Sequence, residues 1–172
     1  MGNLQIRLAE GNDAFQIAKV HVDTWQFAYR GQMPGAFLNS LSVERRTKFW
    51  QEALSNPNNH TAVWVAEANK TVIGFCSAGV SRDDDRKPDT GEIYAIYVDS
   101  KSIGKGVGSS ILHKCLETLR EQGFKEATLW VLDTNEKTRH FYESKGWKED
   151  GATKTEAQDG FDLNEVRYRI IL

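Results

Sequence analysis

A glycine-rich segment between a strand-like run and a helix-like run restricts the fold of this chain more than any other feature. Gly104, Gly106 and Gly108 occupy alternate positions in "IGKGVGSS", and the apolar residues that follow recur with helical spacing. A helix that begins here exposes its first N–H groups and the positive end of its dipole, and the missing side chains leave both open to an anion. The segment therefore predicts a phosphate-binding turn. The alternative, a turn that binds nothing, would need one glycine rather than three.

The spacing of these glycines excludes two common phosphate motifs. A Walker loop places its lysine after the last glycine, followed by Ser or Thr, whereas Lys105 lies between glycines and Val107 follows Gly106. A dinucleotide fingerprint that starts at Gly104 needs its third glycine at the position of Ser109. The segment is therefore expected to bind a phosphate-containing ligand through a motif other than these two.

Periodicity along the rest of the chain predicts a mixed α/β fold in a single domain over residues 1–172. A helix between two strands implies a parallel pair, and the partial alternation of helices and strands favours a mixed sheet with helices on both faces. The expected elements are a strand at 4–10, helices from about 14 and 42, a hairpin over 61–80 that turns at Asn69 and Lys70, a strand at 92–98, a helix over 106–119, a strand at 126–132, a helix over 135–145 and two strands within 148–172.

The composition excludes several classes of function. The chain has 172 residues and a net charge of −2, so it lacks the basic character of a nucleic-acid-binding protein. No apolar run reaches the ~20 residues of a membrane span, and the first residues are too polar for a secretory signal, so we expect a cytoplasmic protein. Cys76 and Cys115 lie in apolar segments and are expected to be buried free thiols. The four histidines are scattered without metal-ligand spacing, so no metal is expected.

Two motifs of the chain resemble those of the Gcn5-related N-acetyltransferases, the GNAT superfamily. "IGKGVG" resembles the family signature Gln/Arg-x-x-Gly-x-Gly/Ala, and "NEKTRHFYESKGW" resembles Asn-x-x-Ala-x-x-Phe-Tyr-Glu-Lys-x-Gly-Phe. The opening residues and the final "VRYRIIL" resemble the first helices and last strand of bacterial members, so the resemblance covers nearly the whole chain. The chain departs from the signatures at Ile103, Thr138 and Trp147. Ile103 replaces a polar residue, which puts one anchoring contact to the donor in doubt.

This resemblance implies a GNAT fold, a mostly antiparallel mixed sheet of about seven strands with one parallel pair and about four flanking helices. It also implies acetyl-CoA as the acyl donor. In the family the strand before the glycines bulges and separates from the next strand, and pantetheine pairs with its main chain. The donor-binding positions implied here are Ile96, Tyr97, Val98, Gly104, Lys105, Gly106, Val107, Gly108, Ser109, Asn135 and Tyr142. Asn135 could instead be an ordinary helix N-cap.

Amine acetylation requires a neutral amine, because an ammonium group has no lone pair for attack. The resemblance implies Glu92 as the base, because it stands at the head of its strand, eleven residues before Ile103, the separation seen in family members that use a glutamate base. A solvated glutamate after a turn is the alternative. Without a bulge, alternation places Glu92, Tyr94, Ile96 and Val98 on one face. The resemblance implies that Tyr142 protonates the leaving thiolate, unless it only fills the edge of the core.

The acceptor is expected to be an amine of a small molecule or a peptide. Trp25, Tyr29 and Tyr94 are candidates for its binding site, although aromatic residues in the two N-terminal helices, such as Trp25 and Tyr29, are more often core. The charged run at 82–87 is expected to be a solvated loop that could border the acceptor entrance. A non-catalytic acyl-CoA-binding module is the alternative function, and the resemblance also allows a homodimer.

Overall fold

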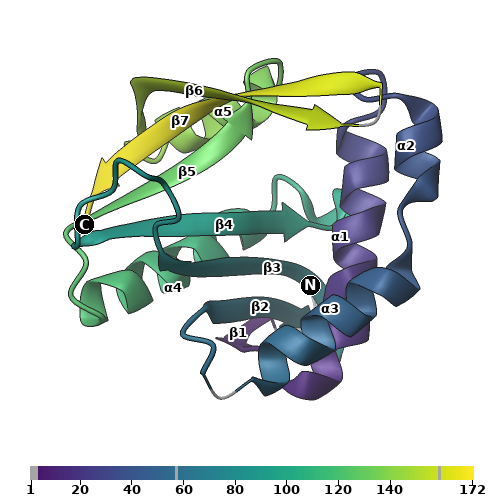
Figure 1. Cartoon of the computed structure of the whole chain (residues 1–172). Helices are drawn as coiled ribbons and strands as arrows, with labels where there is room; N and C mark the ends of the chain where they lie inside the picture. Colours follow the sequence, from purple (N-terminus) through teal and green to yellow (C-terminus); the bar gives the residue numbers. More distant parts are fainter. Residues whose placement is uncertain (1–3, 57, 159) are drawn as a thin grey trace.

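The computed structural model describes residues 4–56, 58–158 and 160–172, which form one seven-stranded sheet (Figure 1). The strands lie in the order β1-β2-β3-β4-β5-β7-β6, and every neighbouring pair is antiparallel except β4–β5. The strands are β1 (Leu4–Leu8), β2 (Ala62–Ala68), β3 (Thr71–Val80), β4 (Thr90–Val98), β5 (Glu126–Leu132), β6 (Lys148–Gln158) and β7 (Phe161–Ile171). The predicted mixed sheet with a parallel pair around the glycine segment is therefore confirmed.

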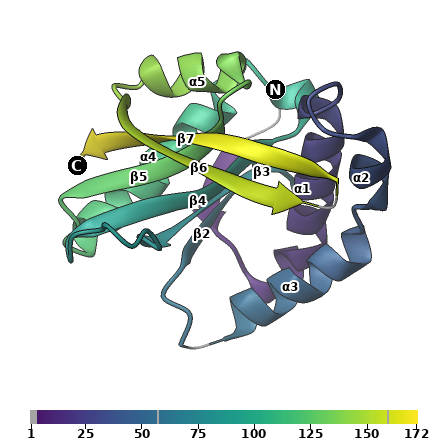
Figure 2. The same cartoon turned by 45° about the horizontal axis from the view of Figure 1, so that its top comes forward.

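Helices cover both faces of this sheet (Figures 1 and 2). One face packs on α4 (Val107–Glu121) and α5 (Glu136–Glu143), whose buried residues share a core cluster with β3, β4, β5 and β7. The other face packs on α1 (Ala14–Ala28) and α3 (Val43–Ser55). Among the described residues, no helix is long and apolar enough to cross a membrane.

Local sequence signals fixed most element boundaries. Gly106 is the N-cap of α4, as the glycine segment predicts. Asn69 and Lys70, at the expected hairpin turn, both have positive φ angles. Cys76 and Cys115 are buried free thiols, and burial followed by the neighbouring Cys115 raises the pKa of Cys76. The short helix α2 (Gly35–Ser40), however, lies in a segment expected to be a plain connection; it follows Pro34 and buries Leu38.

The alternation expected for a strand without a bulge does not hold along β4, because the strand contains one. Ser77 pairs with Ala95 while Ala78 pairs with Ile93, so Tyr94 is an extra residue in the ladder. Ile96 and Val98 therefore pack with Ile93 on the α4 face, opposite to Glu92. The bulge that the family resemblance implied is present, and it changes which side chains share a face.

β4 and β5 pair only at their first residues. Thr90, Gly91 and Glu92 are in register with Glu126, Ala127 and Thr128, and the register stops there. β5 instead keeps β7 as its partner along its whole length, and β4 keeps β3. The two central strands consequently diverge, and the edge of β4 that faces β5 has no strand partner beyond Glu92 among the described residues.

His21 makes the stability of this fold sensitive to acid. Its ring stacks on Tyr97 with centroids 4.8 Å apart, and its buried Nδ1 has no hydrogen-bond partner among the described residues. Burial, with a smaller contribution from Arg46, lowers the His21 pKa from 6.5 to about 3. Between pH 6.5 and 3, His21 therefore binds a proton in the unfolded chain but not in the folded one. The free energy of unfolding has its full His21 contribution above pH 6.5, and this contribution is lost as the pH falls toward 3.

Replacing His21 by Phe should remove this dependence while it retains the aromatic stack. We expect the wild-type free energy of unfolding to lose about 1.4 kcal/mol more per pH unit than that of the variant between pH 6 and 4.5. Urea unfolding at a series of pH values measures the difference. Parallel curves for the two proteins would show that His21 takes up no proton on unfolding in this range.

Candidate active site

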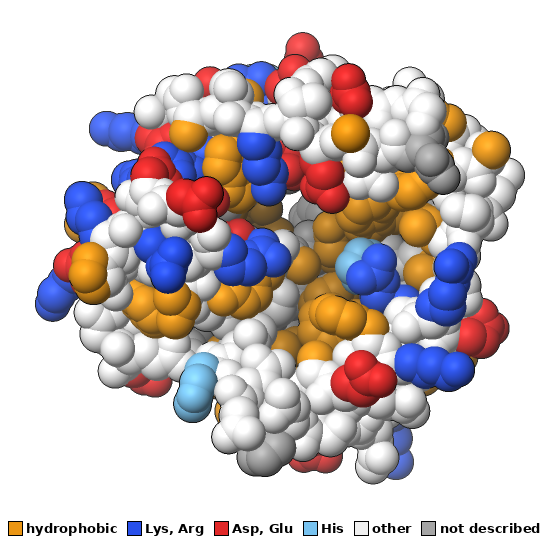
Figure 3. Space-filling view, in the orientation of Figure 1, with side chains coloured by type: hydrophobic (Ala, Val, Ile, Leu, Met, Phe, Trp, Pro, Cys, Tyr) orange, Lys and Arg blue, Asp and Glu red, His pale blue; other side chains and the backbone are white. Residues whose placement is uncertain are grey.

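A cleft of about 1450 Å³ opens where β4 and β5 diverge. Figure 3 shows this hollow near the middle of the molecule, with hydrophobic side chains on its walls. Its lining comes from α1, the loop after β3, β4, the glycine segment, β5, α5 and the β6–β7 hairpin. Of the site residues predicted from the sequence, all line the cleft except Lys105 and Val107. Val107 is buried in the core, so it can contact a ligand only through its backbone, whereas the Lys105 side chain is exposed.

The glycine segment forms one end of this cleft. Gly104 and Gly106 have φ angles of +78° and +81°, which L side chains rarely adopt, and a Cβ on either would meet nothing within 4 Å. In the glycine segment and the start of α4, the first amide that is hydrogen-bonded within the protein is that of Ser110, which donates to the Gly106 carbonyl at 3.0 Å. Within the described chain, the amides of residues 105–109 have no acceptor. This end of the cleft therefore presents consecutive free N–H donors at the positive end of α4.

Tyr142 of α5 lines the cleft and is packed among aromatic side chains. Its ring packs edge-on against Phe141 and Trp147, with centroids 5.4 and 5.9 Å away, and lies 6.3 Å from Tyr168. Burial, with smaller contributions from the charges of Cys76 and Tyr97, raises the pKa of the hydroxyl far above its usual range. The group therefore keeps its proton at neutral pH and can act as a donor in the cleft.

Asn135 begins α5 at the same wall. Its side-chain oxygen accepts a hydrogen bond from the Thr138 amide at 3.3 Å, so Asn135 is the N-cap of this helix. The residue also lines the cleft. The cap and a contact to the donor arm are thus compatible, because the cap uses only the amide oxygen.

Glu92 lies at the point where β4 and β5 part, and its carboxylate is already engaged. Only 2% of the residue is exposed. Arg82 contacts both carboxylate oxygens: its backbone amide donates to Oε2 at 2.8 Å and its guanidinium to Oε1 at 2.5 Å. The Arg82 guanidinium also lies 4.3 Å from the centroid of the Tyr94 ring, whose hydroxyl donates to the Val80 carbonyl. Because 64% of the Arg82 side chain is exposed, the Arg82 guanidinium lies between the Glu92 carboxylate and solvent.

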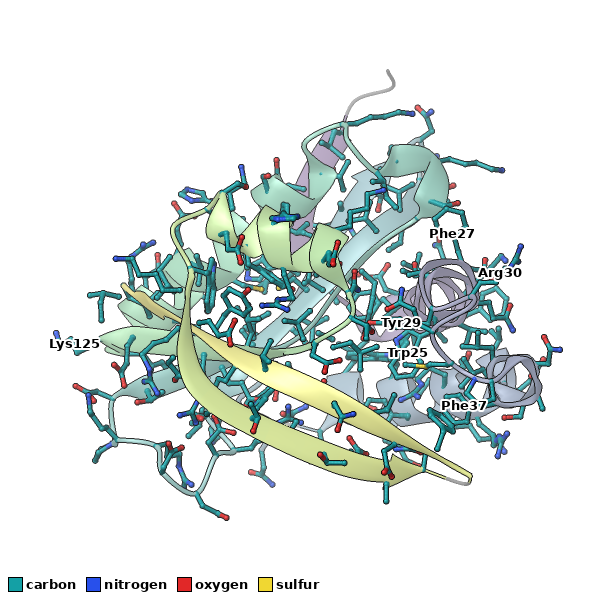
Figure 4. All side chains as sticks on the ribbon, turned by 90° about the horizontal axis from the view of Figure 1, so that it is seen from above. Trp25, Phe27, Tyr29, Arg30, Phe37 and Lys125 are labelled. Carbon is teal, nitrogen blue, oxygen red and sulfur yellow. The ribbon has the colours of Figure 1, made fainter. Side chains whose placement is uncertain are left out.

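The predicted aromatic residues of α1 form one wall of the cleft. Trp25 and Tyr29 project from α1 toward the space between this helix and the β6–β7 hairpin, whereas Arg30 points away (Figure 4). Their rings are in edge contact, with centroids 5.1 Å apart. Burial, followed by the charges of Tyr97, Tyr142 and Glu165, raises the pKa of Tyr29 well above its usual value. Trp25 and Tyr29 are both half-buried, and both line the cleft.

The charged run at 82–87 borders the cleft, as the sequence allowed, but the partners that hold this loop in place were not predicted. The expected solvated loop at 82–87 lines the cleft with its first residues and is fixed by Arg167 of β7. Arg167 donates to Asp83 at 3.1 Å and to Asp85 at 2.6 Å, and the Trp130 indole donates to Asp83 at 2.9 Å. The only sequence signal was the density of acidic residues in this loop, because the partners lie more than forty positions away.

Comparison with known proteins agrees with this geometry. The family model "Acetyltransferase (GNAT) family" matches residues 22–147. The uncharacterized N-acetyltransferase YuaI of Bacillus subtilis (strain 168) is 32% identical over 165 residues, which is 95% of this chain and 88% of that protein.

Solved structures share the fold at lower identity. The PaiA N-acetyltransferase of Thermoplasma acidophilum, solved with coenzyme A, has a TM-score of 0.73 at 20% identity, with 99% of each chain covered. YncA of Salmonella typhimurium, solved with acetyl-CoA, has a TM-score of 0.73 at 20% identity over 99% of this chain and 94% of that chain. Taken with the family match and the bacterial relative, the two motifs and the divergent central strands have one explanation: this chain belongs to the GNAT family of acetyltransferases.

Proposed function

We propose that this protein transfers the acetyl group of acetyl-CoA to a primary amine of a small molecule or peptide by direct attack in a ternary complex. One observation carries the proposal: the free amides at the start of α4 and the protonated hydroxyl of Tyr142 line the same cleft. The amides suit the diphosphate of the donor. The unpaired edge of β4 at residues 96–98 lines the same cleft and suits the pantetheine arm.

The chemistry needs no covalent intermediate on the protein. The amine lone pair attacks the thioester carbon, the C–S bond breaks, and the electron pair leaves on sulfur. Tyr142 donates its proton to that sulfur, and the proton of the attacking nitrogen passes to Glu92, directly or through water. Cys76 and Cys115 are fully buried and take no part.

A panel of primary amines with acetyl-CoA tests the proposal. Thiol release above the rate of hydrolysis, with a mass increase of one acetyl group on the amine, is the expected result. Binding of CoA without thiol release from any amine would favour the acyl-CoA-binding module instead. If CoA does not bind, both the proposed acetyltransferase activity and the acyl-CoA-binding module are excluded.

Replacing Glu92 by Gln tests its proposed role as the base. We expect kcat/KM for the amine to fall roughly 100-fold at pH 7, the lower limit for general bases, because the carboxylate is shared with Arg82. The variant should approach the wild type near pH 10, where the amine loses its own proton. A pH–rate profile that superimposes on that of the wild type would limit Glu92 to holding Arg82.

A further inference from the structure

Glu165 is a cleft carboxylate that the chemistry above does not use. It lies on β7 opposite Leu132 of β5, beyond the point at which β5 leaves β4. Leu132 and Leu163, its neighbour two positions earlier on the same strand face, pack with Trp25 and Tyr29. Glu165 therefore faces the aromatic wall of α1.

The carboxylate of Glu165 is much less engaged than that of Glu92. The Lys154 ammonium, on the neighbouring strand β6, lies 3.0 Å from Oε2. No other donor among the described residues contacts this carboxylate, whereas Arg82 contacts both oxygens of Glu92. The Glu165 side chain is 19% exposed, so a ligand in the cleft can reach it.

Lys154 shows what kind of ligand this position accepts. Its Nζ lies 3.0 Å from Glu165 and 4.5 Å from the centroid of the Trp130 ring. The group is a primary ammonium on an aliphatic chain, held between a carboxylate and an aromatic face. The Lys154 side chain is 41% exposed, and such partly solvated ion pairs are weak enough to be displaced.

We propose that Glu165 binds the acceptor as its ammonium form in place of Lys154, before the same nitrogen gives up a proton and attacks as the neutral amine, and that the site thereby selects primary amines with an apolar body and no carboxylate near the nitrogen. Trp25, Tyr29 and Trp130 supply the apolar walls for that body. The inference rests on the proposed function, and it assigns an acceptor-binding residue to the same cleft.

The electrostatics of the cleft agree with this placement. Burial is the main cause of the raised pKa of Tyr29 and of Tyr97, and the charge of Glu165 contributes to both. Tyr97 in turn contributes to the raised pKa of Tyr142. An ammonium bound at Glu165 would thus lie near the tyrosine cluster that includes the proposed proton donor.

The test compares the two members of the ion pair, with 2-phenylethylamine and L-phenylalanine as probes. These amines share a frame and differ by one carboxylate. With Glu165→Gln we expect the KM for 2-phenylethylamine to rise about 10–100-fold, as for loss of a charged hydrogen bond, and the preference over phenylalanine to shrink. With Lys154→Met we expect that KM to fall about two- to fivefold, because the competing cation is gone. CoA affinity, measured by calorimetry, should be unchanged in both.

The expected changes in KM have opposite signs in the two variants, and this distinguishes a role in acceptor binding from a purely structural role. If the pair only stabilises the hairpin, both variants should lose stability alike and leave the KM unchanged, which would overturn the inference. Equal use of both probes by the wild type would also overturn it. If the wild type binds CoA but acetylates no amine, the proposed function fails as well; if it acetylates 2-phenylethylamine and Glu165→Gln changes nothing, only the present inference fails.

Discussion

Replacing Tyr142 by Phe should lower kcat for acetyl transfer by about 10²–10⁴-fold, the range for a positioned proton donor. The substitution removes one hydroxyl and keeps the ring, so the packing against Phe141 and Trp147 is retained. Burial keeps the hydroxyl protonated at neutral pH, which suits a group that must meet a departing thiolate. CoA affinity should stay within about twofold, because the proposed diphosphate contacts are made by the amides of residues 105–109 and not by the Tyr142 hydroxyl.

Tyr168 offers a matched control for this experiment. It belongs to the same core cluster and is fully buried, but it is not a cleft-lining residue. Its hydroxyl donates to Glu143 at 2.7 Å and accepts from Arg139 at 3.1 Å. Tyr168→Phe should therefore reduce stability and leave kcat unchanged. Steady-state kinetics with a saturating amine measures both variants, and equal kcat values for Tyr142→Phe and the wild type would remove Tyr142 from the chemistry.

Local conformational requirements made the donor end of the site predictable from the sequence. A glycine with positive φ and a helix N-cap each depend on a few neighbouring residues, so "IGKGVG" specifies the turn before α4 almost unaided. The apolar spacing after Gly106 likewise marks the buried face of α4. For the same reason the sequence at Asn135 predicts a helix start, and its side chain caps α5.

The acceptor end depends on contacts between distant segments, which no local pattern encodes. The bulge at Tyr94 arises from the register between β3 and β4, and it moves Ile96 to the face opposite Glu92. Arg82 could not be assigned to Glu92 from spacing, since it lies in a run with several other charges. Glu165 reads as an ordinary polar position of a strand until the β5–β7 register places it in the cleft.

Replacing Gly106 by Val should abolish high-affinity CoA binding, with Kd raised at least about 100-fold. The side chain would enter open space at the start of α4, where the amides of residues 105–109 are free. Hydrogen bonds to a charged group contribute about 1.5–3 kcal/mol each, so the loss of two is sufficient for this effect. S-acetylpantetheine, which lacks the diphosphate, should bind the variant as it binds the wild type.

Backbone strain must be separated from obstruction, because Gly106 has a φ of +81° and a left-handed conformation costs an L residue about 1–2 kcal/mol. Gly123 provides the comparison: it lies just beyond the other end of α4, has a φ of +92°, and its Cβ would also meet nothing within 4 Å. Gly123→Val should lose similar stability and bind CoA normally in calorimetry. If Gly106→Val binds CoA as well as Gly123→Val does, the free amides of α4 are not the diphosphate site, and the donor must enter the cleft by another path.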